Sequence, residues 1–438
     1  MVINDSTRLD SPTPSVEHDI STADDFAFWD DYCKRYIDPL LDAGHYSDQE
    51  RESHRDFIRK YVVPALGPRP DPSVVKPRMA IAPHGGPSDP SINYTAKKAV
   101  ARFGFAVNDP QSFTVEDPLG VKTSYEALAR FAEDKNSGVD LRWLDCLMGL
   151  YPSPGDINVA ADSSLYKNYS RRVALAAGVD FDGPRRNLKV YLSPFIKHAM
   201  TGKSENEIVF DAIKNLEPGG PALRPAVGLL ENYLSTRTGD FYLGNQFIGI
   251  DCADPSKARV KLYMATDTAR FDFIRTAMTL SGRLNDEYTT KGMEILRDIW
   301  HLLLGEPDSI SEDWNKPRNK LANALPGVFV SYEIRAGVEL PDIKVYVPMW
   351  LYHRSDEAIA ENLDRIFTRL RDRDIMGEWA WGRGIGEGYQ DFFNKTFGAG
   401  GVPGPTMVHT WCTYCFTKDR GVYMTSYMAK NVEFPLPF

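Results

Sequence analysis

Three short segments of the chain alternate strictly between apolar and polar positions. They are Leu188–Leu192, Val260–Met264 and Ile343–Val347, and in each a Lys and a Tyr alternate with three apolar residues. As β-strands, these segments place Lys and Tyr on one face and the apolar side chains on the other. Their lysines lie 72 and 83 positions apart, which indicates an internal repeat.

The polar face of these strands has two interpretations. On an ordinary sheet the Lys and Tyr side chains would cover a solvated surface, and for any single strand this is the simpler interpretation. Three equivalent strands that pair in one sheet would instead build a row of ammonium groups beside a row of phenol rings. That face suits the inside of a barrel whose aliphatic outer face is covered by helices, and we favour this interpretation for the set.

The rest of the pattern runs helix, helix, strand, strand, and then begins again. Apolar positions at helical spacing predict helices over 26–41, 124–133, 141–150, 204–216, 222–235, 269–280, 288–304 and 356–372, and Ser47-x-x-Glu50 is a capping box for a helix reaching Val63. Further strands are expected at 93–95, 102–105, 247–251, 327–335, 407–418 and 421–429. Short hairpins separated by helix pairs predict one closed antiparallel sheet with helices on its outside.

The domain organisation follows from the same pass along the chain. Residues 1–22 are rich in Ser, Thr, Pro and Asp, and we expect a mobile segment there. Because no linker divides the remainder, we expect a single barrel domain over 23–438.

Composition limits the partners and the compartment. A net charge of −9 argues against nucleic acid, which selects for a basic surface. Five scattered cysteines fit a reducing compartment better than a disulfide framework. Because the chain has neither a signal peptide nor an apolar run of roughly 20 residues, we expect a cytoplasmic protein with no membrane partner.

Familiar short motifs do not explain the chemistry. Cys412-x-x-Cys415 has no second ligand pair, so a structural role is expected, and no metal site is predicted. The glycine-rich stretch at 382–388 lacks phosphate-loop spacing and is interpreted as a flexible connection or lid. Neither GxSxG nor HExxH occurs, and the Asp pairs at 24–25 and 30–31 do not have the DDxxD spacing that holds magnesium on a diphosphate.

The cations and tyrosines suggest a different chemistry. Five basic residues would line the predicted barrel: Arg102, Lys189, Arg259, Lys261 and Lys344. Together they could hold a polyanion such as a diphosphate directly through charge-assisted hydrogen bonds. Ionisation of an allylic diphosphate leaves a carbocation, which aromatic faces stabilise by about 2 kcal/mol or more per ring when desolvated. A closed barrel would also exclude the water that traps such a cation.

At this point the chain resembles the fungal aromatic prenyltransferases of the dimethylallyltryptophan synthase type. The resemblance covers residues from about 26 to the end and rests on LKVYLSP, RVKLYMA followed by TLSGRLND, IKVYVPMWLY, and HTWCTYCF with GVYMTSY. It implies an α+β fold in which repeated ααββ units form a ten-stranded antiparallel β-barrel surrounded by α-helices. It also implies a prenyl diphosphate donor and no metal or other cofactor.

The resemblance assigns roles to individual residues. It implies that the diphosphate is bound by Arg102, Lys189, Arg259, Lys261, Lys344 and Arg420. It implies a tyrosine shield around the carbocation made of Tyr191, Tyr263, Tyr346 and Tyr414, closed by Tyr423 or Tyr427. Lys344 stands where relatives often have Gln, which is a tolerable change for a phosphate contact.

Two positions depart from relatives that use indole. The relatives carry a Glu in a PxE[FY]S-like stretch, and this Glu accepts the indole N–H. In this chain SINYT places Asn93 at that position, or Ile92 in an alternative alignment with Pro90. We therefore expect the carboxylate to be absent and Asn93 to contact the acceptor. The lysine of relatives that prenylate indole C4 is replaced by Ala176, which favours a phenolic or polycyclic aromatic acceptor, or an indole held differently.

The sequence therefore predicts a metal-independent aromatic prenyltransferase of secondary metabolism. It would transfer a dimethylallyl or longer prenyl group from its diphosphate to an electron-rich aromatic small molecule, with the base unidentified. A noncatalytic barrel that binds an aromatic anionic metabolite, or a prenyl diphosphate hydrolase or cyclase of the same fold, is an alternative. The sequence leaves open whether the protein forms a homodimer.

Overall fold

The structure is a computed structural model that describes residues 23–70, 80–82, 86–109, 112, 114, 116–151, 174–237, 244–317, 327–376, 388–398 and 408–429. The segment at 1–22 and the glycine-rich stretch up to residue 387 lie outside the described residues. The extent of the single domain, 23–438, stays a prediction.

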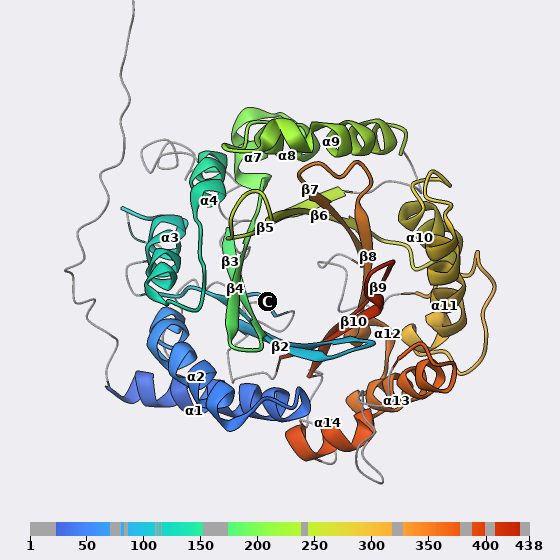
Figure 1. Cartoon of the computed structure of the whole chain (residues 1–438), viewed down its shortest axis with the longest axis horizontal. Coiled ribbons are helices and arrows are strands. Elements are labelled where there is room, and N and C mark those ends of the chain that lie inside the picture. The colour runs from blue at the N-terminus through green and yellow to red at the C-terminus, as the bar shows by residue number, and fades with distance from the viewer. Residues whose placement is uncertain are drawn as a thin grey trace, which may run out of the picture.

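Ten strands close into one antiparallel barrel (Figure 1). Each strand pairs with its neighbours in the chain, and β1 pairs with β10 to complete the cylinder. The strands are β1 Ser88–Thr95, β2 Ala99–Ala106, β3 Leu175–Asp182, β4 Arg185–Leu192, β5 Gly244–Asp251, β6 Arg259–Thr266, β7 Val328–Arg335, β8 Asp342–Pro348, β9 His409–Thr417 and β10 Gly421–Met428. The predicted ten-stranded antiparallel barrel is confirmed.

Helices form a ring around the outside of the barrel (Figure 1). They are α1 Ala23–Ala43, α2 Asp48–Phe57, α3 Val121–Ala129, α4 Arg142–Leu147, α7 Phe195–Thr201, α8 Glu205–Lys214, α9 Gly220–Ser235, α10 Phe271–Met278, α11 Glu287–Leu303, α12 Met349–Tyr352, α13 Asp356–Asp372 and α14 Tyr389–Phe397. Helices precede each of the five hairpins, so the predicted ααββ repeat is confirmed in the described chain. None of the helices among these residues is long and apolar enough to cross a bilayer.

Local sequence sets the helix ends as expected. Ser47 caps α2: its hydroxyl accepts from the Glu50 N–H at 3.4 Å, and the Glu50 carboxylate accepts from the Ser47 N–H at 2.9 Å. This reciprocal pair satisfies two N–H groups that have no partner inside the helix. The helix continues to Val62 as a short π-helical turn.

The hydrophobic core lies between the barrel and the helices. Alternate residues of the Lys-x-Tyr strands point outward into it and are 0% exposed: Val190, Val260, Leu262, Met264, Val345 and Val347. Burying an aliphatic side chain of this size stabilises the fold by about 1.5–3 kcal/mol. The lysines and tyrosines between them consequently face the inside of the barrel, called the lumen below.

Candidate active site

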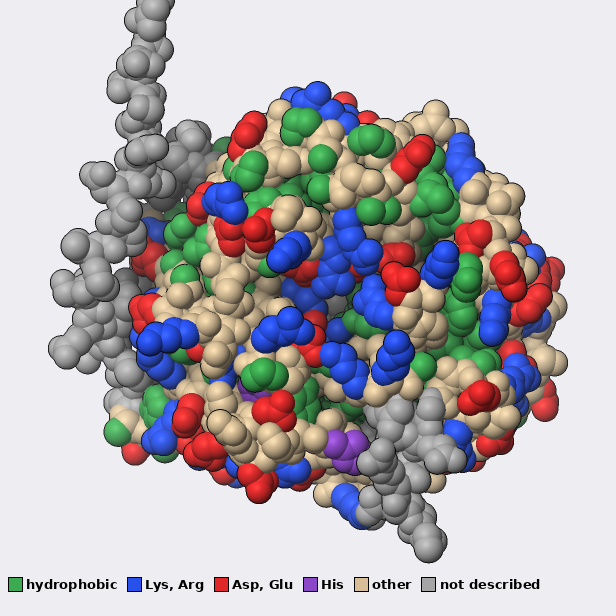
Figure 2. Space-filling model, viewed as in Figure 1, with side chains coloured by type: hydrophobic (Ala, Val, Ile, Leu, Met, Phe, Trp, Pro, Cys, Tyr) green, Lys and Arg blue, Asp and Glu red, His purple; other side chains and the backbone are tan. Residues whose placement is uncertain are grey.

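Charged side chains from seven neighbouring strands and one hairpin turn meet on the lumen wall. We call this set the ionic layer, and it consists of Arg102, Asp180, Lys189, Asp251, Arg259, Lys261, Glu333, Arg335, Asp342, Lys344 and Arg420. Cations outnumber carboxylates in it by seven to four. Figure 2 shows Lys and Arg side chains around a hollow at the centre of this face of the molecule.

On one side of the layer, Asp180 of β3 joins cations of β2 and β4. Its carboxylate lies 3.1 Å from Nε of Arg102 and accepts a hydrogen bond from Lys189. Burial alone would raise the pKa of Asp180, but Arg102 and Lys189 outweigh burial and lower it to about 2. Burial lowers the pKa of Lys189 to about 7 even though Asp180 opposes the change. The ammonium group of Lys189 is therefore only weakly held in its charged form.

On the other side, Asp251 of β5 and Glu333 of β7 enclose the cations of β6. Nζ of Lys261 lies 3.1 Å from Asp251 and 4.0 Å from Glu333. Arg259 bridges the same two carboxylates at 2.5 Å and 3.1 Å. Burial would raise the pKa of both acids, but the cations, with Lys261 first for Asp251 and Arg259 first for Glu333, hold it well below its usual range.

Tyr423 of β10 lies among three cations of the layer. Its hydroxyl accepts a hydrogen bond from Arg102, and the centre of its ring lies 4.0 Å from Nζ of Lys344 and 5.0 Å from Cζ of Arg420. Burial would raise the pKa of Tyr423, but Arg102, Lys344 and Lys189 together lower it to about 7. A phenol in this position can be ionised near neutral pH.

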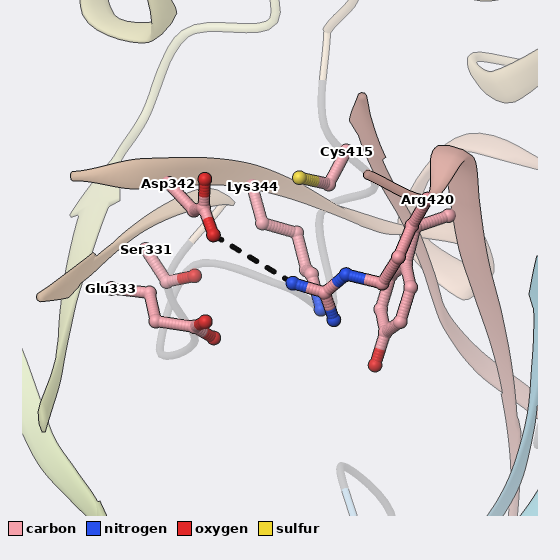
Figure 3. Close-up of a pocket in the computed structure, with 7 residues that line it drawn as sticks. Ser331, Glu333, Asp342, Lys344, Cys415 and Arg420 are labelled. Carbon is pink, nitrogen blue, oxygen red and sulfur yellow. Dashed lines mark ion pairs between the residues drawn. The ribbon is translucent and has the colours of Figure 1, made fainter. Parts of the chain in front are cut away.

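A pocket opens beside Tyr423. It is lined by Ser331, Glu333, Asp342, Lys344, Cys415, Arg420 and Tyr423. Figure 3 shows the guanidinium group of Arg420 next to Lys344 and directed at Asp342, with which it forms an ion pair at 3.6 Å. An anion that entered this pocket would meet the two cations Lys344 and Arg420.

Four tyrosines form a continuous arc next to the ionic layer. The ring centres of Tyr191 and Tyr263 are 5.8 Å apart, those of Tyr263 and Tyr346 are 5.6 Å apart, and those of Tyr346 and Tyr427 are 6.4 Å apart. We call these four residues the tyrosine arc. A Cβ at Gly249 would lie 3.1 Å from the rings of both Tyr191 and Tyr263, so glycine leaves the space that the rings occupy.

Tyr414 does not belong to this arc, which corrects the prediction made for it. It pairs with Val345, an outward-facing residue of β8, and its hydroxyl donates to the carbonyl of Gly292 in α11 at 2.7 Å. Tyr414 therefore fills the interface between β9 and a helix. Cys412 shares this outer face, whereas Cys415 faces the lumen pocket, so the two thiols lie on opposite sides of the strand and both are free.

A carboxylate that the sequence interpretation did not consider lies near the start of the barrel. Asp89 of β1 lies on the same face as Ser91, which pairs with Arg102 and Tyr427. Asp89 accepts a hydrogen bond from Thr410 at 2.9 Å, and burial raises its pKa to about 7. The pattern PxE[FY]S would have pointed to this residue only with Asp allowed in place of Glu and Pro in place of the aromatic residue, because the chain reads PSDPS at 87–91.

The side-chain amide of Asn93 is hydrogen-bonded to the neighbouring strand β10. Its amide nitrogen donates to the Met424 carbonyl at 2.7 Å and to the Thr425 hydroxyl at 3.1 Å, and the residue is 1% exposed. Its contact with an acceptor stays a prediction that rests on sequence alone.

The acids of the ionic layer were also missed, although the sequence carries a signal for them. Asp180, Asp251 and Glu333 precede the three motif lysines by 9, 10 and 11 positions. In an antiparallel hairpin this spacing places the acid on the strand next to the lysine and within its reach. Within the part of the chain that the structure describes, no group of three His, Cys, Asp or Glu residues could hold a metal ion.

Comparisons with known proteins agree with this architecture. The model of a family described as tryptophan dimethylallyltransferase matches residues 25–379. An indole diterpene prenyltransferase of Tolypocladium album is 31% identical over 438 residues, 96% of this chain and 97% of that protein. An indole prenyltransferase of Emericella nidulans is 33% identical over 425 residues, 93% of this chain and 96% of that protein. The crystal structure of AnaPT from Neosartorya fischeri shares the fold with a TM-score of 0.76, at 24% identity over 94% of this chain and 97% of that one.

Proposed function

Since the chain belongs to the tryptophan dimethylallyltransferase family, we propose that it transfers a dimethylallyl group from its diphosphate to an electron-rich aromatic small molecule. The observation that carries this proposal is the convergence of the ionic layer and the tyrosine arc on one lumen. A polyanion is stabilised by cations and a carbocation by aromatic rings. Here the ionic layer and the tyrosine arc, which supply these groups, lie next to each other in the lumen.

In this proposal the diphosphate binds to the cations of the ionic layer. Arg102, Lys189, Arg259, Lys261, Lys344 and Arg420 would contact its oxygens, and Tyr423 would donate a hydrogen bond to it once protonated. The bond between the allylic carbon and the diphosphate oxygen then breaks, and the electron pair leaves with the diphosphate. Charge-assisted hydrogen bonds favour this step because negative charge on the leaving oxygen increases. We propose that the cations suffice for it, so that transfer is metal-independent.

The tyrosine arc would hold the allyl cation until the acceptor attacks. Tyr191, Tyr263, Tyr346 and Tyr427 present aromatic faces, each of which is worth about 2 kcal/mol or more to a desolvated cation. A carbon of the aromatic acceptor then forms the new bond, and the resulting arenium ion loses a proton to restore the ring.

We propose that the Asp89 carboxylate contacts the aromatic acceptor in the lumen. A carboxylate with a pKa of about 7 is suited both to accept a hydrogen bond from an acceptor N–H or O–H and to take up a proton near neutral pH. The names of the two relatives and the presence of this carboxylate both support an indole-type acceptor. A cytoplasmic location and a homodimer stay predictions from the sequence.

A direct assay tests the proposed function. Purified protein is incubated with dimethylallyl diphosphate and a panel of indoles and naphthols, and the products are analysed by mass spectrometry. We expect a product heavier by one dimethylallyl group with at least one indole. Release of dimethylallyl alcohol at the same rate with and without every acceptor would instead identify a hydrolase, and donor binding without turnover would identify a binding protein.

A further inference from the structure

Basic and acidic strands alternate around the ionic layer. Lys189 of β4 pairs with Asp251 of β5, Lys261 of β6 pairs with Glu333 of β7, and Arg102 of β2 pairs with Asp180 of β3. Each of the three acids contacts at least one cation at hydrogen-bond distance. An anionic substrate would gain nothing from direct contact with these carboxylates, so their placement at its proposed binding site needs another explanation.

Burial provides that explanation. The side chains of Lys189 and Lys261 are only 7% and 9% exposed, and a buried ammonium group without a counter-ion loses its proton or adopts another conformation. A carboxylate on the neighbouring strand prevents both outcomes while the chamber is empty.

We infer that Asp180, Asp251 and Glu333 are positioning residues, which keep the cations of the neighbouring strands charged and in place to receive the diphosphate. The inference rests on the proposed function of the ionic layer. The three acids would act through the cations and would not contact the donor themselves.

Lys189 is the most sensitive reporter of this role. The charged or titratable groups around it are Asp180 on β3, Asp251 on β5, Arg102 on β2, Lys261 on β6 and Tyr423 on β10. Burial and the two cations lower the pKa of Lys189 to about 7, while Asp180 is the first of the groups that raise it. Without Asp180, Lys189 should lose its proton at a lower pH.

The test measures binding of inorganic pyrophosphate by calorimetry from about pH 5 to about pH 9, a range that spans the titration of Lys189. Every protein compared, including the one with an otherwise wild-type sequence, carries Tyr423→Phe, because the Tyr423 phenol has a pKa of about 7 and would add a fall of its own. For the wild type, affinity should fall as pH rises through about 7, where Lys189 loses its proton. In Asp180→Asn this fall should move to lower pH by about one unit or more, because an opposite charge at hydrogen-bond distance shifts a pKa by about one to three units. At the acid end of the range the variant should bind at least as tightly as the wild type, because one negative charge is gone.

The substitution Lys189→Arg provides the rescue. An arginine side chain stays protonated throughout this range without help from a carboxylate, so Lys189→Arg combined with Asp180→Asn should no longer show the shifted fall. Asp134→Asn is the matched control: Asp134 forms a partly buried ion pair with Arg186 at 3.1 Å outside the lumen. That variant should lose stability and keep the wild-type pH profile.

Two outcomes would overturn the inference. Asp180→Asn could weaken binding by the same factor at every pH, or the shifted fall could persist when Lys189→Arg is combined with Asp180→Asn. If Asp180→Asn does not fold, Asp251→Asn takes its place, because Asp251 pairs with Lys189 from the other neighbouring strand and its removal should likewise move the fall to lower pH. Failure of the proposed function is separate: the wild type would then bind pyrophosphate without prenylating any acceptor.

Discussion

Lys261 is the residue whose surroundings bear most directly on the proposed diphosphate site. It lies between Asp251 and Glu333, and its side chain is 9% exposed. We expect Lys261→Ala to lower kcat/KM for the donor by roughly tenfold to a hundredfold, since a hydrogen bond to a charged group is worth about 1.5–3 kcal/mol. Steady-state kinetics at fixed acceptor would measure this. Lys257→Ala, in the exposed loop before the same strand, is the control, and undiminished turnover in Lys261→Ala would contradict the assignment.

Asp89 predicts a pH dependence of the acceptor step. Because burial raises its pKa to about 7, the fraction that can accept a proton increases as pH rises through that value. With the donor saturating, kcat/KM for the acceptor should therefore rise with pH in the wild type. In Asp89→Asn the residual rate should be low and should no longer rise with pH in the same range. A variant that kept the wild-type profile would exclude Asp89 as the proton acceptor.

At the scale of elements, β5 shows why a strand residue can be small for a functional reason. A Cβ at Gly249 would lie 3.1 Å from the rings of Tyr191 and Tyr263, which would have to move by a few tenths of an ångström. We expect Gly249→Ala to lower kcat about tenfold or more through loss of cation stabilisation, with pyrophosphate affinity unchanged. Gly228→Ala in α9, where a Cβ meets nothing within 4 Å, is the control. An unaltered kcat would show that the position of these rings does not matter.

The interface between β9 and α11 carries a second prediction at this scale. Tyr414→Phe removes the hydrogen bond to the Gly292 carbonyl and should lower the free energy of unfolding by about 1 kcal/mol. Transfer kinetics should stay within the error of the wild type, because the ring lies outside the lumen. Denaturant unfolding and a product assay on the same preparation would measure both. A large loss of prenyl transfer without loss of stability would contradict this and would support a role for Tyr414 in shielding the carbocation.

These elements also show how far sequence reasoning could reach. The Lys-x-Tyr strands were predictable because polar and apolar residues alternate cleanly, which fixes the inner face. In β9 neither face is clearly polar, since Trp411 and Thr413 alternate with Cys412 and Tyr414, and the face of Tyr414 could not be chosen. Strand β3 was missed as an element because small residues such as Ala176 and Gly178, which leave space in the lumen, have weak strand propensity.

At the scale of the whole molecule, closure of the barrel brings residues from distant parts of the chain into one chamber. Arg102 and Tyr423, for example, are 321 positions apart and share a hydrogen bond. The repeat predicted that such groups would converge. It did not predict the carboxylates between them, because the resemblance drew attention to cations and tyrosines alone.

The whole protein should also respond to ligand and to metal removal in a defined way. Pyrophosphate that binds only the folded barrel should raise Tm, by an amount equivalent to about 2.7 kcal/mol at a hundredfold excess over Kd. If the cations suffice to hold the diphosphate, a chelator should change neither this increase in Tm nor the rate of transfer. Thermal melts and product assays with and without chelator would measure both, and loss of transfer that magnesium restores would contradict metal independence.

The most direct test of the central claim is a crystal structure with a nonhydrolysable thio analogue of dimethylallyl diphosphate. The account predicts density for the diphosphate within hydrogen-bond distance of Arg102, Lys189 and Lys261, with the prenyl group against the tyrosine arc. Density for the analogue outside the barrel, or with its prenyl group directed away from those rings, would contradict the account.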